Sequence, residues 1–81
     1  MKIETKYNVG QHIWIVCEQN KTATVYDDYI GSIVIDATGY TYGTKESYEE
    51  LQEEQIILYE DNEKLLQRIK NILGGIDNEK S

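Results

Sequence analysis

The sequence predicts a mainly β (α+β) fold: a small five-stranded barrel followed by one C-terminal α-helix. Two observations favour this fold. The 81 residues are rich in isoleucine and contain seven tyrosines but no phenylalanine or proline, a β-branched and aromatic mixture that suits sheets. Short apolar runs alternate with turn residues up to position 59, after which the apolar spacing becomes helical. With 40% apolar residues, the chain can build one modest core, so we expect a single domain over residues 1–76.

The first strand is expected at residues 12–18, after a turn at residues 8–11. Alternation along a strand places Ile13, Ile15 and Cys17 on one face. The opposite face then carries His12, Trp14 and Val16. Because both faces hold apolar side chains, we expect this strand to be covered on both sides or to lie at the seam of the barrel.

Two hairpins should follow. Asn20 tolerates a left-handed backbone, so residues 18–21 predict a turn into residues 22–35, which form either one long bent strand or two consecutive strands. Gly31 suits a bend or bulge there. Residues 36–39 begin with Asp and end with Gly, as a turn would, and lead to a strand at 40–42. Residues 47–51 and 56–59 are the last expected strands, separated by an acidic bend at 53–55.

A helix is expected over residues 61–73. Its apolar stripe consists of Leu65, Leu66, Ile69, Ile72 and Leu73. Asp61 is a suitable N-cap residue, and the pair at positions 74 and 75, both glycine, should end the helix. Residues 77–81 are expected to form a polar tail. The width of the stripe also suggests a homodimer through this helix.

The charge of the chain is concentrated in one segment. The formal net charge is −7, and residues 36–63 hold nine acidic residues and one basic residue, a net charge of −8. Such a segment either keeps a small protein in solution or docks on a basic protein surface. For docking, we expect these partner-binding residues: Glu46, Glu49, Glu50, Glu53 and Glu54, with Tyr42 or Tyr48 as the apolar anchor. No basic patch is present, which argues against direct binding of nucleic acid or of an anionic membrane.

The chemistry-bearing residues predict no enzyme, cofactor or metal site. His12 and Cys17 fall on opposite faces of one strand and cannot form a base and nucleophile pair. One cysteine and one histidine cannot build a structural zinc site. The paired carboxylates are adjacent in sequence rather than set across a cleft, and neither a calcium loop nor a glycine-rich phosphate loop is present.

The tyrosines allow a second binding hypothesis. Aromatic side chains could line a groove for a peptide or a methylated lysine, as small barrels do; the residues considered are Trp14, Tyr26, Tyr29, Tyr40, Tyr42 and Tyr48. Alternatively, tyrosine replaces phenylalanine in the core, and this explanation is favoured for Trp14 and Tyr7. No apolar run approaches the length that spans a bilayer, and the N-terminus lacks the apolar core of a signal peptide, so a cytoplasmic protein is expected.

Three stretches carry a resemblance to a known group. The segment KYNVGQHIW at residues 6–14, the strand IGSI at 30–33, and EQIILY at 54–59 before a terminal helix resemble small proteins encoded by phages and prophages of Gram-positive bacteria. Those proteins are similar to Src-homology-3-like barrels. In such barrels Gly-Asp commonly precedes the first alternating strand, whereas here Gln11 follows Gly10.

The resemblance implies a context for the acidic segment. Small acidic phage proteins without catalytic motifs are often inhibitors of a host defence or nucleic-acid enzyme. The resemblance therefore implies a non-enzymatic inhibitor whose anionic surface mimics nucleic acid and occupies a basic channel of a host nuclease or defence complex. The alternative is a structural or regulatory interaction module with an aromatic groove and no inhibitory role.

Overall fold

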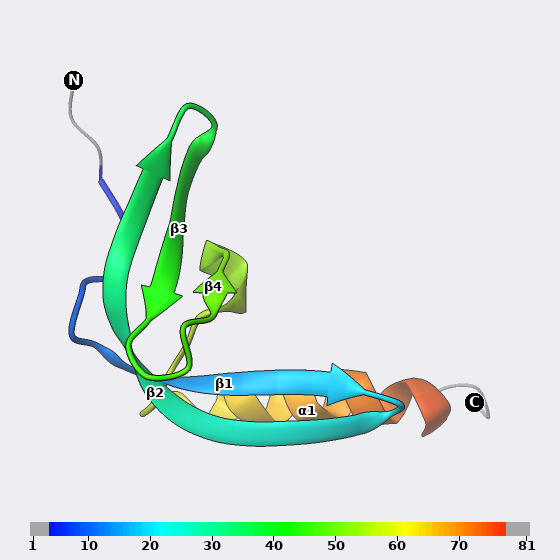
Figure 1. Cartoon of the computed structure of the whole chain (residues 1–81). Coiled ribbons are helices and arrows are strands. Elements are labelled where there is room, and N and C mark those ends of the chain that lie inside the picture. The colour runs from blue at the N-terminus through cyan, green and yellow to red at the C-terminus, as the bar shows by residue number, and fades with distance from the viewer. Residues whose placement is uncertain (1–3, 78–81) are drawn as a thin grey trace.

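The fold is a five-stranded antiparallel sheet with one C-terminal helix, and the computed structural model describes residues 4–77 (Figure 1). The elements in chain order are β1 (His12–Gln19), β2 (Thr22–Asp36), β3 (Gly39–Thr44), β4 (Glu50–Leu51), the 3₁₀ turn η1 (Glu53–Gln55), β5 (Ile57–Leu58) and α1 (Asn62–Asp77). Among these residues, no helix is long and apolar enough to cross a membrane.

The long strand β2 organises the sheet, whose strand order is β4-β3-β2-β1-β5. The first half of β2 pairs with β1, and the second half pairs with β3. Between the halves β2 bends sharply, so that the β2–β3 hairpin stands away from the β1–β2 hairpin (Figure 1). The pairing with β3 shifts between Ile30 and Ser32, a bulge at Gly31, as its sequence position suggests. A Cβ at Gly31 would lie 3.0 Å from the Lys45 Cα, so this close approach favours glycine.

The β1–β2 hairpin confirms the predicted alternation. Its turn consists of Asn20 and Lys21, both in the left-handed region with φ of 53° and 62°, which matches the right-handed twist of the strands. Ile13 and Ile15 are buried on one face. On the other face, His12 and Trp14 are half-buried. The helix α1 contacts the strands β1, β2 and β5.

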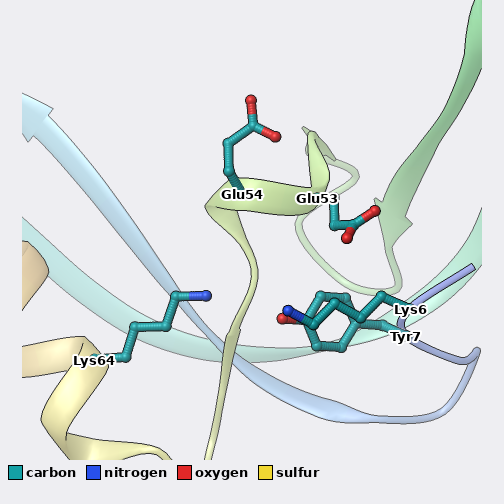
Figure 2. A pocket seen from close by; sticks show the side chains of 5 residues that line it. All are labelled: Lys6, Tyr7, Glu53, Glu54 and Lys64. Atoms are coloured by element: carbon teal, nitrogen blue, oxygen red, sulfur yellow. The ribbon is translucent and has the colours of Figure 1, made fainter.

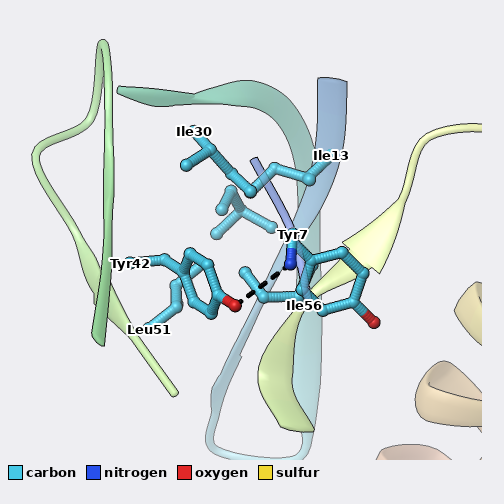
Figure 3. Close-up of a cluster of buried hydrophobic side chains, with 7 residues drawn as sticks. Tyr7, Ile13, Ile30, Tyr42, Leu51 and Ile56 are labelled. Atoms are coloured by element: carbon cyan, nitrogen blue, oxygen red, sulfur yellow. Dashed lines mark hydrogen bonds between the residues drawn. The ribbon is translucent and has the colours of Figure 1, made fainter. Parts of the chain in front are cut away.

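The core lies at the bend of β2 (Figure 3). It consists of Tyr7, Ile13, Ile15, Ile30, Tyr42, Leu51 and Ile56. The backbone N–H of Tyr7 donates to the Tyr42 hydroxyl over 3.2 Å, and the two rings meet edge to face with centroids 5.7 Å apart. Tyrosine therefore takes the place of phenylalanine in this core, and its hydroxyl fixes the segment that precedes β1.

The predicted barrel is not confirmed, because the sheet is open. The edge strands β4 and β5 have two residues each and pair only with β3 and β1 respectively. The strand expected at residues 47–51 is reduced to Glu50–Leu51 because hydrogen bonds from the preceding residues go to side chains, as described below. The mainly β fold with a C-terminal helix is confirmed; closure into a Src-homology-3-like barrel is not.

The helix begins as predicted but ends later. The Asp61 carboxylate accepts a hydrogen bond from the Lys64 N–H at 3.1 Å, which confirms Asp61 as the N-cap. The helix continues through the glycine pair to Asp77, since glycine in a helix costs only about 1 kcal/mol relative to alanine. Leu66 and Leu73 are 57% and 41% exposed, so the buried stripe is narrower than expected. The polar tail is expected at residues 77–81; Asp77 instead belongs to the helix, and residues 78–81 lie outside the described residues.

Candidate functional site

The loop between β3 and β4, residues 45–49, is held by a buried carboxylate. We call it the acidic loop because Glu46 and Glu49 lie in it. Asp28 of β2 is only 2% exposed. Its oxygens accept hydrogen bonds from the Glu46 N–H at 3.0 Å, the Ser47 N–H at 2.8 Å and the Ser47 hydroxyl at 2.7 Å. The loop is thus fastened to the bend of β2.

The electrostatics of Asp28 follow from these contacts. Burial alone raises the pKa of its carboxyl, but the hydrogen bonds from Ser47, Tyr29 and Glu46 outweigh burial and hold the pKa below its ordinary value. Asp28 is therefore a charged anchor. Its negative charge is satisfied inside the protein and is not available to a partner.

A second contact closes the acidic loop. The buried Thr44 hydroxyl accepts a hydrogen bond from the Glu49 N–H at 2.6 Å and lies 2.8 Å from the Ser47 hydroxyl. The Thr44 N–H donates to the Glu49 carbonyl at 2.9 Å. Both ends of the loop are therefore fixed, and residues between them have a defined backbone.

Tyr48 stands at the tip of this fixed loop. It is 87% exposed, the largest exposed fraction among the exposed large apolar side chains of the described chain. Its φ of 55° lies in the left-handed region, which costs a tyrosine conformational energy. The loop therefore holds an aromatic ring in solvent, in an unfavourable backbone conformation, between Glu46 and Glu49.

The acidic residues expected at the site do not share one face. The Glu50 carboxylate accepts a hydrogen bond from the Thr41 hydroxyl at 2.9 Å, and the Glu53 carboxylate accepts one from the Tyr40 hydroxyl at 2.6 Å. Tyr40 and Thr41 are consecutive in β3, so their side chains point to opposite faces of the sheet. The hydrogen bond to Glu53 raises the pKa of Tyr40 to about 12. Glu53 therefore contacts β3 on one face of the sheet, and Glu50 contacts it on the other face.

Tyr42 is a correction to the expected site. It is fully buried, with its hydroxyl bonded to the Tyr7 N–H, and it cannot contact a partner. Its position in β3 opposite Leu51 of β4 turns it into the core. Of the two candidate anchors, only Tyr48 is exposed. Within the described chain, no basic side chain forms an ion pair with Glu46, Glu49 or Glu50.

Glu54 belongs to a different surface, an open pocket of about 600 Å³ beside η1 (Figure 2). Lys6, Tyr7, Glu53 and Lys64 also line it. Lys64 donates to the Ile56 carbonyl at 2.7 Å, and the Lys6 ammonium lies 5.5 Å from the centre of the Tyr7 ring. The pocket thus mixes both charges, and its lysines already have partners in the protein.

A second feature, which the sequence did not reveal, is a stack of four aromatic rings that we call the aromatic ladder: Tyr29, His12, Tyr59 and Trp14. The ring centroids of His12 lie 4.4 Å from Tyr29 and 3.8 Å from Tyr59, and Tyr59 lies 4.6 Å from Trp14. The Trp14 indole N–H donates to the Tyr59 carbonyl at 3.0 Å. Trp14 is thus half-buried in the ladder rather than in the core.

The ladder forms because three strands bring distant residues together. His12 pairs with Tyr29 in the β1–β2 register, and the Tyr59 N–H donates to the His12 carbonyl at 2.9 Å. The exposed Asp27 completes the group, with its Oδ2 2.6 Å from the His12 Nε2. Strand parity placed His12 and Trp14 on one face from sequence alone, but the contribution of Tyr59 depends on the β1–β5 pairing, which no local pattern encodes.

The structure places the remaining candidates apart. Cys17, which alternation places on the face of Ile13 and Ile15, is exposed near the end of β1. Within residues 4–77, no group of three or more His, Cys, Asp or Glu side chains is arranged to hold a metal ion. Comparison of this chain with protein-family models, with curated proteins and with solved structures found no match.

Proposed function

We propose that this chain is a non-enzymatic binding protein whose acidic loop, together with Glu50, attaches to a basic protein surface. The observation that carries the proposal is the exposed Tyr48 ring, fixed in a left-handed conformation between glutamates. An exposed aromatic side chain on a residue with a left-handed backbone costs free energy in an isolated protein, and such residues commonly serve binding.

The charges around Tyr48 suit the same role. Glu46, Glu49 and Glu50 are exposed and have no basic partner within the described chain, so their field reaches the solvent. Clustered carboxylates of this kind accelerate encounter with a basic partner, and a central aromatic ring supplies apolar contact after encounter. The buried Asp28 reduces the entropy lost on binding because the loop is already ordered.

The partner class that best fits is a protein that itself binds nucleic acid. A basic channel offers closely spaced lysines and arginines, and the acidic loop together with Glu50 presents exposed carboxylates in place of phosphates. An inhibitor of a host nuclease or defence complex, as the resemblance to phage proteins implies, would act by occupying such a channel. The proposal therefore includes competition between this chain and nucleic acid.

The test is an affinity capture with matched baits. Wild-type protein should retain a basic nucleic-acid-binding protein that the triple variant E46K/E49K/E50K and the variant Tyr48→Ala both lose. Added duplex DNA or RNA should displace it, and its dissociation constant should rise steeply with salt. The control E18K/E60K/E63K changes charge equally at exposed glutamates elsewhere and should retain the protein. Equal retention by E46K/E49K/E50K and wild type would contradict the proposal.

The aromatic ladder supports a second candidate function, an interaction module that recognises a peptide. Tyr29 and Tyr59 are 39% and 43% exposed, and Asp27 beside them could pair with a cationic side chain. Binding through aromatic contact would tolerate salt and would depend on Tyr59 rather than on Tyr48. Comparison of Tyr59→Ala with Tyr48→Ala in the same capture therefore separates the two functions.

A further inference from the structure

The outer edge of the first half of β2 has no neighbouring strand among the described residues. There β2 pairs with β1 on one side only, because β3 pairs with β2 from Ile30 onward (Figure 1). Free strand edges present unpaired N–H and C=O groups and serve as templates for another strand.

The hydrogen-bond pattern identifies which groups are free. The His12 carbonyl accepts a hydrogen bond from the Tyr59 N–H. The backbone N–H and C=O groups of even-numbered residues of β1 therefore point toward β5, and those of odd-numbered residues point toward β2. Their β2 partners are Thr22, Thr24, Tyr26 and Asp28. The backbone groups of the intervening residues of β2 must then point away from β1. The Tyr29 carbonyl does so, since it accepts a hydrogen bond from the Lys45 N–H at 2.8 Å. The outward residues without a backbone partner are Ala23, Val25 and Asp27.

The helix α1 adds an independent observation on the same side. The Lys64 and Arg68 side chains reach the Ile56 and Glu54 carbonyls, which places that flank of the helix toward β5. At 100° per residue, Leu66 and Leu73 lie about 140–180° away, on the flank under the free edge of β2. Both leucines are exposed, at 57% and 41%.

We propose that this edge of β2 and this flank of α1 pair with a second copy of the chain about a two-fold axis at Val25. The sequence suggested a homodimer through the helix stripe; the structure adds the strand edge and the register. A two-fold axis at Val25 pairs the two β2 strands antiparallel, with Ala23 of one copy opposite Asp27 of the other. Every free backbone N–H and C=O group of this edge then has a partner. No two carboxylates lie opposite each other. An axis at Thr24 or Tyr26 would leave one residue unpaired.

The spacing of the layers agrees with this arrangement. In the dimer the strand order is β1, β2, then β2 and β1 of the second copy, with neighbouring strands about 4.8 Å apart. A helix over each β1–β2 pair then lies two strand spacings, about 10 Å, from the other helix. This is a normal packing distance for two helices. Val25 pairs with Val16, about 13 Å along β1 from the His12–Tyr59 contact at about 3.3 Å per residue, or about nine helix residues at about 1.5 Å each. Val25 is therefore level with a part of α1 between about residue 68, counted from Tyr59, and about residue 71, counted from Asn62. The midpoint between Leu66 and Leu73 lies within this range, so Leu66 of one copy lies near Leu73 of the other.

The occupant is a second copy rather than an unrelated strand because both features are self-complementary about the same axis. The edge of β1 is the competing site. Only its residues 13 and 14 pair with β5, so Val16 and Glu18 also have free backbone groups, but the helix flank beside that edge carries Lys64 and Arg68 instead of leucines.

Sedimentation equilibrium from micromolar to millimolar concentration tests the dimer. The mass should approach twice the 9.4 kDa of the chain, and the variant L66K/L73K should stay at 9.4 kDa with an unchanged circular dichroism spectrum. The control V34K/I35K, with similarly exposed residues on the β2–β3 hairpin, should dimerise as wild type does. A monomer at every concentration, or a dimer of L66K/L73K, would overturn the proposal.

Amide exchange then identifies the edge. At dimer-forming concentration, the N–H groups of Ala23, Val25 and Asp27 should exchange at least ~10-fold more slowly than at high dilution. Protection of Val16 and Glu18 instead would assign the interface to β1 and overturn the proposal. The residues involved differ from Glu46, Tyr48 and Glu49, so failure of the dimer would leave the proposed binding function standing.

Discussion

Asp27 and Asp28 are neighbours in β2, yet their side chains lie on opposite faces of the sheet. Asp28 is 2% exposed and fastens the acidic loop through two backbone N–H groups of the loop and a hydroxyl. Asp27 is exposed and meets one histidine at the margin of the aromatic ladder. The same side chain therefore has a structural role on one face and a surface role on the other.

The difference lies in what surrounds each carboxylate. Asp28 is surrounded by fixed donors, so removal of its charge leaves several groups unsatisfied. Asp27 can exchange its histidine partner for water, so this exposed contact contributes little to folding. We therefore expect variants of Asp28 to act through the acidic loop and the whole fold, whereas variants of Asp27 should lose only the contact with His12.

The largest effect is expected for Asp28→Ala. The Glu46 N–H, the Ser47 N–H and the Ser47 hydroxyl would lose their acceptor inside the protein, and the free energy of unfolding should fall by about 2–4 kcal/mol. Urea denaturation measures this change. Asp28→Asn keeps the shape and one acceptor oxygen, so it should cost less than alanine. A fall below about 1 kcal/mol for alanine would show that the loop is held by other contacts.

Acid should weaken the same anchor. The folded-state pKa of Asp28 is lowered, so its contribution to stability is fully present above the ordinary carboxyl pKa of 3.8 and is lost as pH falls through the folded value below it. The free energy of unfolding of wild type should therefore decrease below pH 3.8, and that of Asp28→Asn should decrease less. Parallel pH profiles of the two proteins, measured by urea denaturation, would contradict this assignment.

The fold could be predicted wherever the controlling interactions are local. Alternation along β1, the Asn20 turn, the bulge at Gly31 and the Asp61 cap all follow from backbone preferences of nearby residues, and all are present. The barrel could not be predicted, because closure depends on whether β4 and β5 meet. Both strands are two residues long and pair elsewhere.

The site was partly predictable for the same reason. The acidic segment and Tyr48 are visible in the sequence. That Glu50 and Glu53 lie on opposite faces of the sheet depends on their contacts with Thr41 and Tyr40, whose side chains alternate between the faces of β3. Tyr42 and Tyr48 look alike in sequence, and only the pairing of Tyr42 with Leu51 shows that Tyr42 is buried. Asp28 as an anchor depends on a contact 18 and 19 residues away.

Tyr48→Gly should separate stability from binding. Glycine adopts a φ of 55° without strain, so the free energy of unfolding should rise by about 0.5–1 kcal/mol, while capture of a basic partner should be lost with the ring. Tyr48→Ala, which keeps the strain but removes the ring, is the matched control for binding. A decrease in stability for Tyr48→Gly would show that the ring contributes packing, in conflict with its 87% exposure.

The smallest effect is expected for Asp27→Asn. The carboxylate is about half exposed, and the pair with His12 spans a surface where water competes, so the free energy of unfolding should change by less than about 1 kcal/mol. The His12 ring should remain stacked between Tyr29 and Tyr59, because the stack depends on strand register rather than on the carboxylate. Ring-current shifts of the His12 protons in an NMR spectrum report that stacking directly. Loss of those shifts in Asp27→Asn would mean that the Asp27 carboxylate orients the ladder through His12, and the two aspartates would then share a structural role on their separate faces.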